Sequence, residues 1–473
     1  MLAPKYGRLQ APRFANLRAL CYFCKRRIEN RFQSRLLSPP FEGCSRRWMP
    51  TPSKVRTQLF WMVVVSFSLH IAAIGIFHFY RFRTDDNHFG FGWEMGRIGQ
   101  SIALGQGFSN PYGGSTGPTA WEPPLYPYLI GGVFKLFGIY SDASAWVLLS
   151  FNSLLTALTC IPIFLIARKT MSEKVATWSA WTWALLPYAM YWSVHWVWDT
   201  TLAPLLLSLI FLVTLELEEC QSWKGWAAFG VLWGLASLTN PSMLSFLPFS
   251  GLWAWHRRRQ RGLPSIAGIA LASGLFFACL TPWLARNYVT FGRFVFVRND
   301  FGYELRLGNG PYADGRLMPY LQPNLNQLEL ETYSRLGELA YEERCKQLAF
   351  EWIHEHPRRF AVISLKRVFY YWNNTPKATN SRAPVDFGNS LFLASSVLAV
   401  WGVGRAIRKR IPGAWLFLWL MLIYPAIYYF FYPGARYRHP IEPELLILIV
   451  FVISEAIKPP VSLRDARREI QER

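Results

Sequence analysis

Long blocks of apolar residues without charge are the feature that most constrains how this chain can fold. Residues 57–80 contain no Asp, Glu, Lys or Arg, and the same holds from residue 225 to residue 255. A helix that crosses a bilayer needs about 20 mostly apolar residues. Only 17% of the residues are charged, whereas about 25% is usual in soluble domains. The blocks exclude a soluble enzyme, a disordered chain and a disulfide-rich secreted domain, and they predict an all-α polytopic membrane protein.

The spacing of these blocks predicts about ten transmembrane helices. Asn240-Pro241 breaks the run 225–255, so we expect a hairpin of two short helices there. The segment 124–139 is short and carries Lys135, which indicates a re-entrant or interfacial helix rather than a span. The expected spans are 57–80, 144–167, 175–194, 200–215, the two arms of 225–255, 263–285, 387–404, 413–433 and 440–457.

The basic residues predict the orientation of these helices. Loops on the cytoplasmic side of a membrane are enriched in Lys and Arg. Basic groups at 168–174, 257–261 and 405–410 fall on one side of the predicted topology. We therefore expect this side, and both ends of the chain, to face the cytoplasm. The long loops 81–143 and 286–386 then lie on the outer side of the membrane.

Residues 1–56 form a basic tail ahead of the first span. They contain 13 Lys or Arg and two Glu, so this tail carries about half of the net charge of +21. Anionic membrane lipid explains such charge more simply than nucleic acid does, and we expect no nucleic acid partner. An alternative is that translation begins at Met49. The transmembrane domain is expected over 57–457, followed by a cytoplasmic tail over 458–473.

The first outer loop contains acids that could act as a catalytic base. A short helix is expected over 93–103, with Glu94, Arg97 and Ser101 on one face. A carboxylate in such a loop can take a proton from an acceptor hydroxyl. The alternative is a solvated loop whose acids cap helices. The candidate acids are Asp85, Asp86, Glu94 and Glu122.

The second outer loop begins with three arginines just beyond an apolar span, Arg286, Arg293 and Arg298. Paired N–H donors let Arg bind phosphate well, and this position suits the phosphate of a lipid. The alternative is ordinary contact with lipid headgroups, because long basic side chains reach the membrane surface in many membrane proteins.

Two further groups of polar residues flank outer ends of predicted spans. Arg436, Arg438 and His439 lie just before the last span and could close the same cavity. Asp199 lies at the start of the fourth span. We interpret it first as a helix N-cap beside Thr200, and second as a site residue, since acids at a membrane edge are often functional.

Five segments, taken together, resemble a known superfamily. They are ALGQGFSNPY (103–112), GPTAWEPPLYPYL (117–129), GLASLTNPSMLSFLP (234–248), TPWLARNYVTFGRFVFVRNDFGYELRLGN (281–309) and RYRHPIEPELLIL (436–448). In order and placement they are similar to the GT-C membrane glycosyltransferases, in particular the family 39 or protein-mannosyltransferase-like bacterial group. That group includes the aminoarabinose and rhizobial lipopolysaccharide transferases. The likeness runs from about residue 55 to residue 457.

The resemblance implies an inverting glycosyltransferase of a bacterial inner membrane, which moves a sugar from a polyprenyl-phosphate donor to a lipid, glycan or protein acceptor outside the cytoplasm. Its base would be an acid of the first loop. The acidic pair of the family is displaced here, so Glu94 is the first choice, because it lies on the helix leading to Gly105. Asp86 is the second choice, and Glu122 is an assisting acid.

The resemblance also implies which residues hold the donor phosphate. They are Arg286, Arg293 and Arg298, helped by Arg438 and His439. We expect no metal and no other cofactor. Two other functions stay open: a transporter or flippase of a lipid-linked molecule, and a non-catalytic membrane protein that retains the fold.

Overall fold

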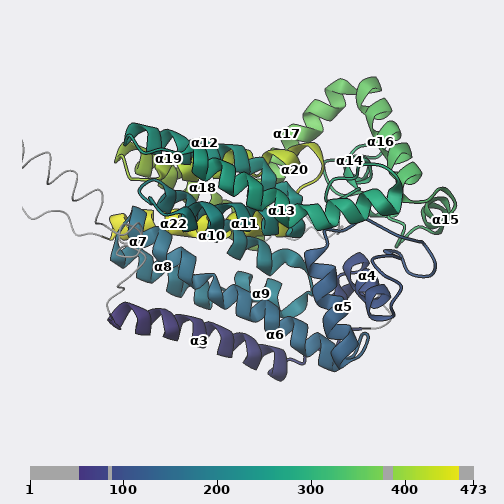
Figure 1. Ribbon diagram of the computed structural model, residues 1–473, viewed down its shortest axis with the longest axis horizontal. Coiled ribbons are helices and arrows are strands. Elements are labelled where there is room, and N and C mark those ends of the chain that lie inside the picture. The colour runs from purple at the N-terminus through teal and green to yellow at the C-terminus, as the bar shows by residue number, and fades with distance from the viewer. Residues whose placement is uncertain (1–52, 84–87, 376–386, 458–473) are drawn as a thin grey trace, which may run out of the picture. The chain divides into compact units, whose positions relative to one another are not determined.

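The computed structural model describes residues 53–83, 88–375 and 387–457, and these ranges are almost entirely helical (Figure 1). Contacts group residues 52–219 and 223–473 into one unit, which is described here. Within the described ranges there is no strand beyond one isolated bridge between Ser109 and Pro118. The predicted all-α membrane fold is therefore confirmed.

Five described segments are long and apolar enough to cross a membrane. A bilayer core of about 30 Å needs about 20 residues at 1.5 Å per residue. The five are α3 (Ser53–Ile76), α6 and α7 (Asp142–Leu158, Cys160–Thr170), η2 and α10 (Asp199–Thr201, Leu202–Leu217), α13 (Ile266–Phe291) and α18 (Phe387–Arg408).

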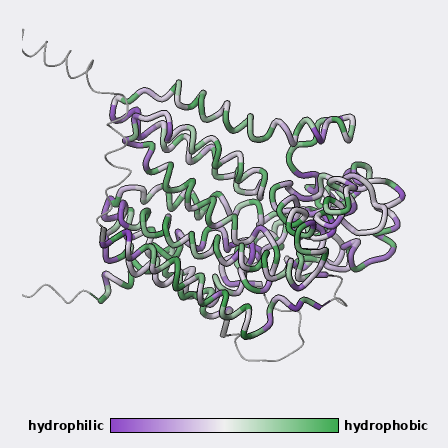
Figure 2. Tube along the Cα trace, turned by 60° about the horizontal axis from the view of Figure 1, so that its bottom comes forward, coloured by the Kyte–Doolittle hydropathy of each residue, from purple (hydrophilic) through white to green (hydrophobic). Residues whose placement is uncertain are grey.

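The other predicted spans are shorter helices, so the number of ten stays a prediction. They are α8 (Glu173–Leu185), α9 (Pro187–His195), α11 (Trp223–Thr239), α12 (Leu247–Gln260), α19 (Ala414–Ile423), α20 (Ala426–Phe430) and α22 (Glu442–Ala456). Figure 2 shows hydrophobic residues along the helices and hydrophilic residues toward both ends of the unit.

The predicted hairpin at Asn240-Pro241 is confirmed. Helix α11 ends at Thr239, the 3-10 turn η3 (Pro241–Phe246) follows, and α12 runs back. The start of α11 and the end of α12 lie together, because the Arg258 guanidinium stands 5.4 Å from the Trp226 ring. Asn240 shapes the turn by accepting a hydrogen bond from the backbone N–H of Ser242.

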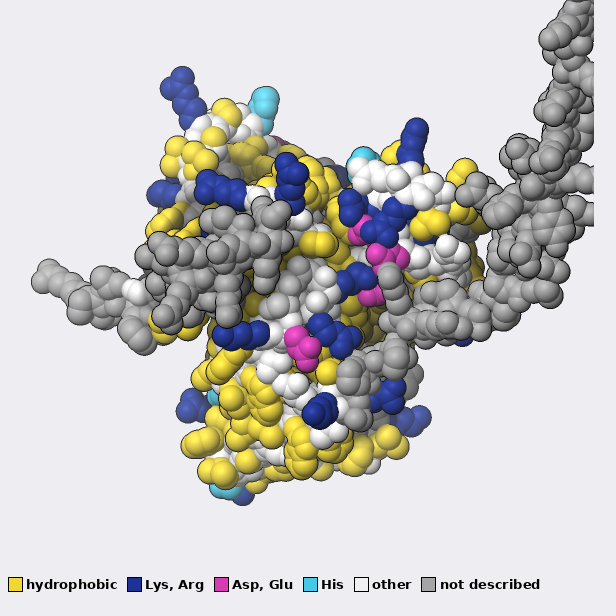
Figure 3. All heavy atoms as spheres, turned by 90° about the vertical axis from the view of Figure 1, so that its left-hand side faces the viewer, with side chains coloured by type: hydrophobic (Ala, Val, Ile, Leu, Met, Phe, Trp, Pro, Cys, Tyr) yellow, Lys and Arg dark blue, Asp and Glu magenta, His cyan; other side chains and the backbone are white. Residues whose placement is uncertain are grey.

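The basic groups that predicted orientation meet at one end of the unit. Lys169 pairs with Glu216 at 3.0 Å, and Arg257 pairs with Glu218 at 2.5 Å, so the ends of α7 and α12 both adjoin the end of α10. Gly413, in the loop after α18, lies against Thr170 of α7 and Leu215 of α10, since a Cβ added to it would contact both side chains. The loop after α18 therefore lies at the same end. Figure 3 shows Lys and Arg gathered on this end of the unit.

The two long loops lie at the opposite end of the unit, on the right in Figure 1. The first loop forms α4 (Glu94–Ala103) and α5 (Leu125–Phe137), and the second forms the helices α14 to α17. At 13 residues, α5 is about 20 Å long, too short to cross the bilayer core. The bounds in the second loop are α14 (Phe301–Gly308), η4 (Pro319–Leu321), α15 (Gln327–Leu336), α16 (Glu338–Glu355) and α17 (Pro357–Asn373).

Close packing fixes α4 on α5. A Cβ added to Gly99 would lie 2.6 Å from Ile130, and one added to Gly131 would lie 2.7 Å from Ile102. The two helices can approach this closely only because both positions lack a side chain. This contact holds the helix that carries Glu94 in place.

A buried carboxylate anchors the return of the first loop. Glu338, at the start of α16, accepts hydrogen bonds from the hydroxyl of Thr119, from the backbone N–H of Ala120 at 2.9 Å and from Asn299 at 3.3 Å. An aromatic cluster lies beside it, formed by Tyr112, Trp121, Tyr303, Tyr333 and Tyr341. Together they join the two long loops next to Glu122.

Candidate active site

Glu94 begins α4 directly after a sharp backbone turn. Gly92 has φ 80°, and Trp93 has φ 38°, a region that residues other than glycine rarely adopt. A Cβ added to Gly92 would lie 2.6 Å from the carbonyl oxygen of Val197 and from the Trp198 ring. The turn is thus pressed against the segment before α10, and this fixes where α4 begins.

The Glu94 carboxylate is half-buried and held through one oxygen. Its Oε1 accepts a hydrogen bond from Asn324 Nδ2 at 2.6 Å, and the amide oxygen of Asn324 accepts one from Arg97. Its Oε2 accepts no hydrogen bond from another side chain within the described ranges. Burial raises the pKa of Glu94, while a hydrogen bond from its own backbone N–H and the charges of Arg97, Arg436 and Arg298 lower it. One oxygen oriented by Asn324 and a second oxygen without a side-chain donor suit a general base.

Arg298 is the cation at the centre of a group of acids. Its Nε lies 2.7 Å from the carbonyl oxygen of Trp121 and 2.8 Å from Asp300 Oδ2. Its Nη2 lies farther from its partners, 3.4 Å from Glu122 Oε1 and 3.5 Å from Glu304 Oε1. Short charge-assisted hydrogen bonds measure about 2.7–2.9 Å, so Nη2 can still take a stronger acceptor.

Glu122 is buried and shares this site with other acids. Its pKa is raised to about 8, chiefly by burial; the charge of Arg298 lowers it, and the charges of Glu94, Asp199 and Glu304 raise it. Glu122 therefore holds a proton at neutral pH. The mutual effects also show that these acids lie in one electrostatic neighbourhood, although they come from distant parts of the sequence.

Arg436 is a second cation at this site. Its guanidinium stands 4.7 Å from the Trp198 ring and 4.6 Å from the Tyr437 ring, a stacking that holds the charge in place. Its charge acts on the Glu94 carboxylate. Its Nη2 donates to the Tyr437 hydroxyl at 2.5 Å, but within the described ranges Arg436 makes no ion pair, so no carboxylate neutralises its charge by direct contact.

Arg286 has most of its donors engaged by the backbone. Its Nη1 donates to the carbonyl oxygen of Thr119 at 2.6 Å, and its Nη2 donates to that of Phe108 at 2.7 Å. The guanidinium also stands 4.8 Å from the Trp283 ring. These contacts make Arg286 a brace between α13 and the first loop.

Arg293 is exposed, and within the described ranges it makes no ion pair and no hydrogen bond. The structure thus gives the three predicted arginines of this loop three different surroundings.

Arg438 and His439 lie inside the protein. Arg438 is fully buried, its Nε lies 2.8 Å from Glu442 Oε1, and its remaining nitrogens donate to Ser395 and Ser396 at 2.7 Å. His439 is also fully buried, its ring lies against Trp183, and burial lowers its pKa to about 3. Arg438 therefore fastens α22 to α18, and His439 is neutral.

Three acids of the sequence prediction are Asp85, Asp86 and Asp199. Asp85 and Asp86 lie outside the described residues. The interpretation of Asp199 as an N-cap is wrong: Asp199 is the first residue of η2, and no side-chain cap begins η2 or α10. Its Oδ2 instead accepts a hydrogen bond from Asn240 at 3.3 Å, and its charge acts on Glu122.

Sequence reasoning missed several residues of the site. Asn324 orients Glu94 from 230 positions away. Asp300 and Glu304 flank Arg298, and the Tyr432 hydroxyl donates to Glu304. Asp300 and Glu304 stand within the quoted segment 281–309, so their closeness to Arg298 in the sequence was an available signal. Nothing in the sequence marked Asn324.

The described ranges contain no group of three or more His, Cys, Asp or Glu side chains placed to hold a metal ion. The expectation that the chain needs no metal stays a prediction.

Residues 121–285 match the sequence model of a family described as dolichyl-phosphate-mannose-protein mannosyltransferase. The match covers about a third of the chain. It includes Glu122 and Asp199 but not Glu94, Arg298 or Arg436. No curated protein matches the sequence.

Solved structures of two membrane enzymes show a distant likeness. The oligosaccharyltransferase AglB from Archaeoglobus fulgidus is 13% identical with a TM-score of 0.42, over 87% of this chain and 53% of the enzyme. The chain thus spans about half the length of AglB. ArnT from Cupriavidus metallidurans, bound to undecaprenyl phosphate, is 12% identical with a TM-score of 0.36, over 86% of this chain and 79% of ArnT. Such scores say nothing about this chain's activity. The family match itself confirms the predicted resemblance to the protein-mannosyltransferase-like group over residues 121–285.

Proposed function

We propose that this chain transfers a sugar, with inversion, from a polyprenyl-phosphate donor to an acceptor hydroxyl on the extracytoplasmic side of a bacterial inner membrane, with both chain ends in the cytoplasm. The family match supports a glycosyltransferase, and the name of that family refers to a lipid-phosphate-linked sugar. The acceptor, which is a lipid, a glycan or a protein, is not part of the proposal.

One observation carries this proposal: the turn that begins the Glu94 helix is pressed against the Trp198 ring, and the Arg436 guanidinium stands 4.7 Å from that same ring. The charges of Arg436 and Arg298 accordingly lower the pKa of Glu94. Sugar transfer needs a base for the attacking hydroxyl and positive charge for the departing phosphate. The three side chains supply both at one place.

In the proposed reaction, Glu94 Oε2 accepts the proton of the acceptor hydroxyl. The hydroxyl oxygen attacks the anomeric carbon of the sugar, and the bond from that carbon to the phosphate oxygen breaks. Arg298 Nη2 and the stacked guanidinium of Arg436 compensate the charge that develops on the phosphate. Glu122 stays protonated at neutral pH and so adds no negative charge beside the phosphate.

The test replaces Glu94 by Gln, which keeps the shape and the contact with Asn324 but cannot accept the proton. Membranes containing the variant receive radiolabelled polyprenyl-phosphate sugars, and label entering acceptors is counted per folded protein. General-base catalysis is worth about 10²- to 10⁴-fold, so we expect a loss of that size.

Glu331→Gln is the matched control, because Glu331 is an exposed acid of the second long loop, in α15, with a single hydrogen bond to Gln327. Equal transfer by the wild type and Glu94→Gln would remove Glu94 from the mechanism. Lipid movement across proteoliposomes without any sugar transfer by the wild type would instead favour a transporter.

A further inference from the structure

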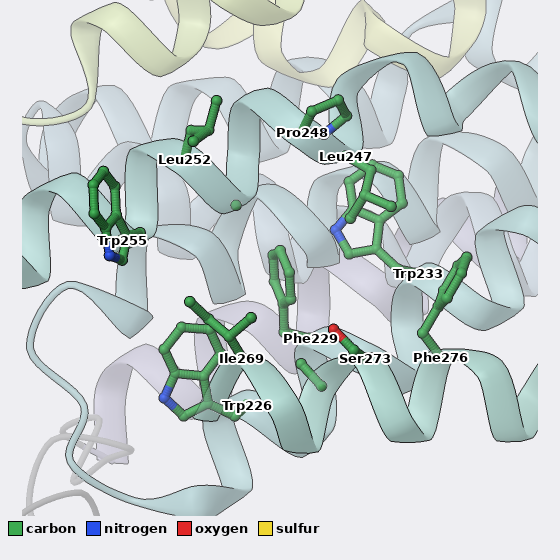
Figure 4. Close-up of a pocket in the computed structure, with 13 residues that line it drawn as sticks. Trp226, Phe229, Trp233, Leu247, Pro248, Leu252, Trp255, Ile269, Ser273 and Phe276 are labelled. Carbon is green, nitrogen blue, oxygen red and sulfur yellow. The ribbon is translucent and has the colours of Figure 1, made fainter. Parts of the chain in front are cut away.

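A large apolar groove lies between α11, α12 and α13, away from the candidate active site. Its volume is about 480 Å³, within the range of roughly 300–1,000 Å³ found for ligand pockets. Figure 4 shows Trp226 and Trp255 toward one end of the groove and Trp233 and Phe276 toward the other. Between Trp226 and Trp233 it follows α11 for about 10 Å at 1.5 Å per residue.

The groove opens on a surface that faces the membrane. Helix α13 is one of the five candidate spans, and only 17% of its apolar window is buried. The apolar side chains Leu252 and Ile269 line the groove and are 59% and 39% exposed. In a bilayer the molecules next to such a surface are lipids, so a lipid chain is the occupant that the position favours.

Arginines surround the end of the groove at Trp226 and Trp255, and most of them are already engaged. Arg257 and Arg261 both pair with Glu218, at 2.5 and 2.6 Å. Arg258 is buried and donates to the carbonyl oxygens of Leu217 and Pro264.

Arg259 differs from these neighbours. It is exposed, stands 5.6 Å from the ring of Trp255, and makes no ion pair or hydrogen bond within the described ranges. Trp side chains occur at membrane–water interfaces, and a basic residue there attracts anionic lipid. The groove therefore has an apolar body and one available positive charge at its interfacial end.

We propose that this groove binds an anionic phospholipid from the bilayer, with one acyl chain between α11, α12 and α13 and the phosphate at Arg259. The positive-inside rule assigns this basic end to the cytoplasm. The groove reaches along α13 to Phe276, and Arg286 lies ten residues later, about 15 Å nearer the outer loops. The proposal concerns a second lipid site and does not depend on the transferase function.

Gly251 allows the groove to be filled without disturbing the helices. It lines the groove, and a Cβ added to it would meet no atom within 4 Å. Gly274 is the matched control: it lies in α13, it also has open space around its Cβ, and it does not line the groove. Gly251→Leu should block the chain, and Gly274→Leu should not.

The full chain is reconstituted in vesicles with equal parts of phosphatidylglycerol and phosphatidylcholine, extracted gently, and examined by native mass spectrometry. We expect wild type and Gly274→Leu to retain one phosphatidylglycerol in preference to phosphatidylcholine, and Gly251→Leu to retain at least tenfold less. Arg259→Gln should still bind lipid but lose about fivefold in headgroup preference, the effect of one basic residue at an anionic surface.

Three results would overturn the proposal. One is equal retention of both phospholipids by the wild type, and another is unchanged retention by Gly251→Leu. The third result comes from vesicles that also contain polyprenyl phosphate. If the wild type retains polyprenyl phosphate in preference to phosphatidylglycerol, and Gly251→Leu does not retain it, the groove binds the lipid chain of the donor instead. Size-exclusion profiles and thermal unfolding report whether each variant is folded. If Gly251→Leu does not fold, Arg259→Gln still tests the contact between the groove and the phosphate headgroup.

Discussion

Replacement of Arg298 by Gln tests the charge balance of the site. Arg298 lies 2.8 Å from Asp300 and 3.4 Å from Glu122, and 27% of its side chain is exposed. Removing one partner of a buried ion pair costs about 3–5 kcal/mol. Partial exposure reduces this, so we expect the variant to lose about 2–4 kcal/mol in free energy of unfolding. The loss of positive charge beside the departing phosphate should lower transfer by about 10²- to 10³-fold.

The pH dependence of this loss follows from Glu122. Arg298 lowers the pKa of Glu122, which is still raised to about 8 by burial. At pH 7 Glu122 is mostly protonated in both proteins, so it contributes little difference. Above pH 8 the wild type has a carboxylate balanced by Arg298, and the variant lacks that balance. The stability difference between the two should therefore widen as the pH rises above 8.

Thermal unfolding in nanodiscs at pH 7 and pH 9, together with the transfer assay, measures both effects. Arg293→Gln is the control, because this nearby arginine is exposed and has no partner in the described ranges. If Arg298→Gln matches Arg293→Gln in stability and transfer, the reasoning about a central cation is refuted.

Two further variants separate chemistry from support. Wild-type transfer should fall above pH 8, because Glu122, whose pKa is about 8, then places a negative charge beside the phosphate. Glu122→Gln copies the protonated acid, so its transfer near pH 7 should stay within about threefold of the wild type and should not fall above pH 8. A fall that persists in the variant would remove Glu122 as its cause. Arg438→Met removes the cation that lies 2.8 Å from the buried Glu442 carboxylate, so the free energy of unfolding should fall by about 3–5 kcal/mol. Transfer per folded protein at low temperature should stay within about twofold of the wild type. Unchanged thermal unfolding would contradict the role of Arg438 in holding α22 against α18.

Local sequence patterns predicted the helices of this protein well. The short helix over 93–103 appears as Glu94–Ala103, and the break at Asn240-Pro241 separates α11 from α12. Both predictions depend on neighbouring residues, because helix periodicity and the missing N–H of proline act over a few positions. The basic clusters likewise predicted which helix ends lie together.

The roles of individual arginines could not be predicted in this way. In the sequence, Arg286, Arg298 and Arg438 are all basic residues near apolar segments. In the structure, Arg286 meets carbonyl oxygens 167 and 178 positions away, while Arg438 meets Ser395 and Ser396 on α18. Whether a guanidinium is engaged or open to an anion depends on these distant partners. The same is true of Asn324 beside Glu94.

The central claim is that Arg298 and Arg436 hold the phosphate of a lipid donor opposite Glu94. A structure of the full chain with polyprenyl phosphate bound, determined by cryo-electron microscopy in nanodiscs, tests it most directly. We predict phosphate density within hydrogen-bond distance of Arg298 Nη2 and of the Arg436 guanidinium, facing the Glu94 carboxylate. Phosphate density at Arg293, with Arg298 still bound only by its acids, would contradict the account.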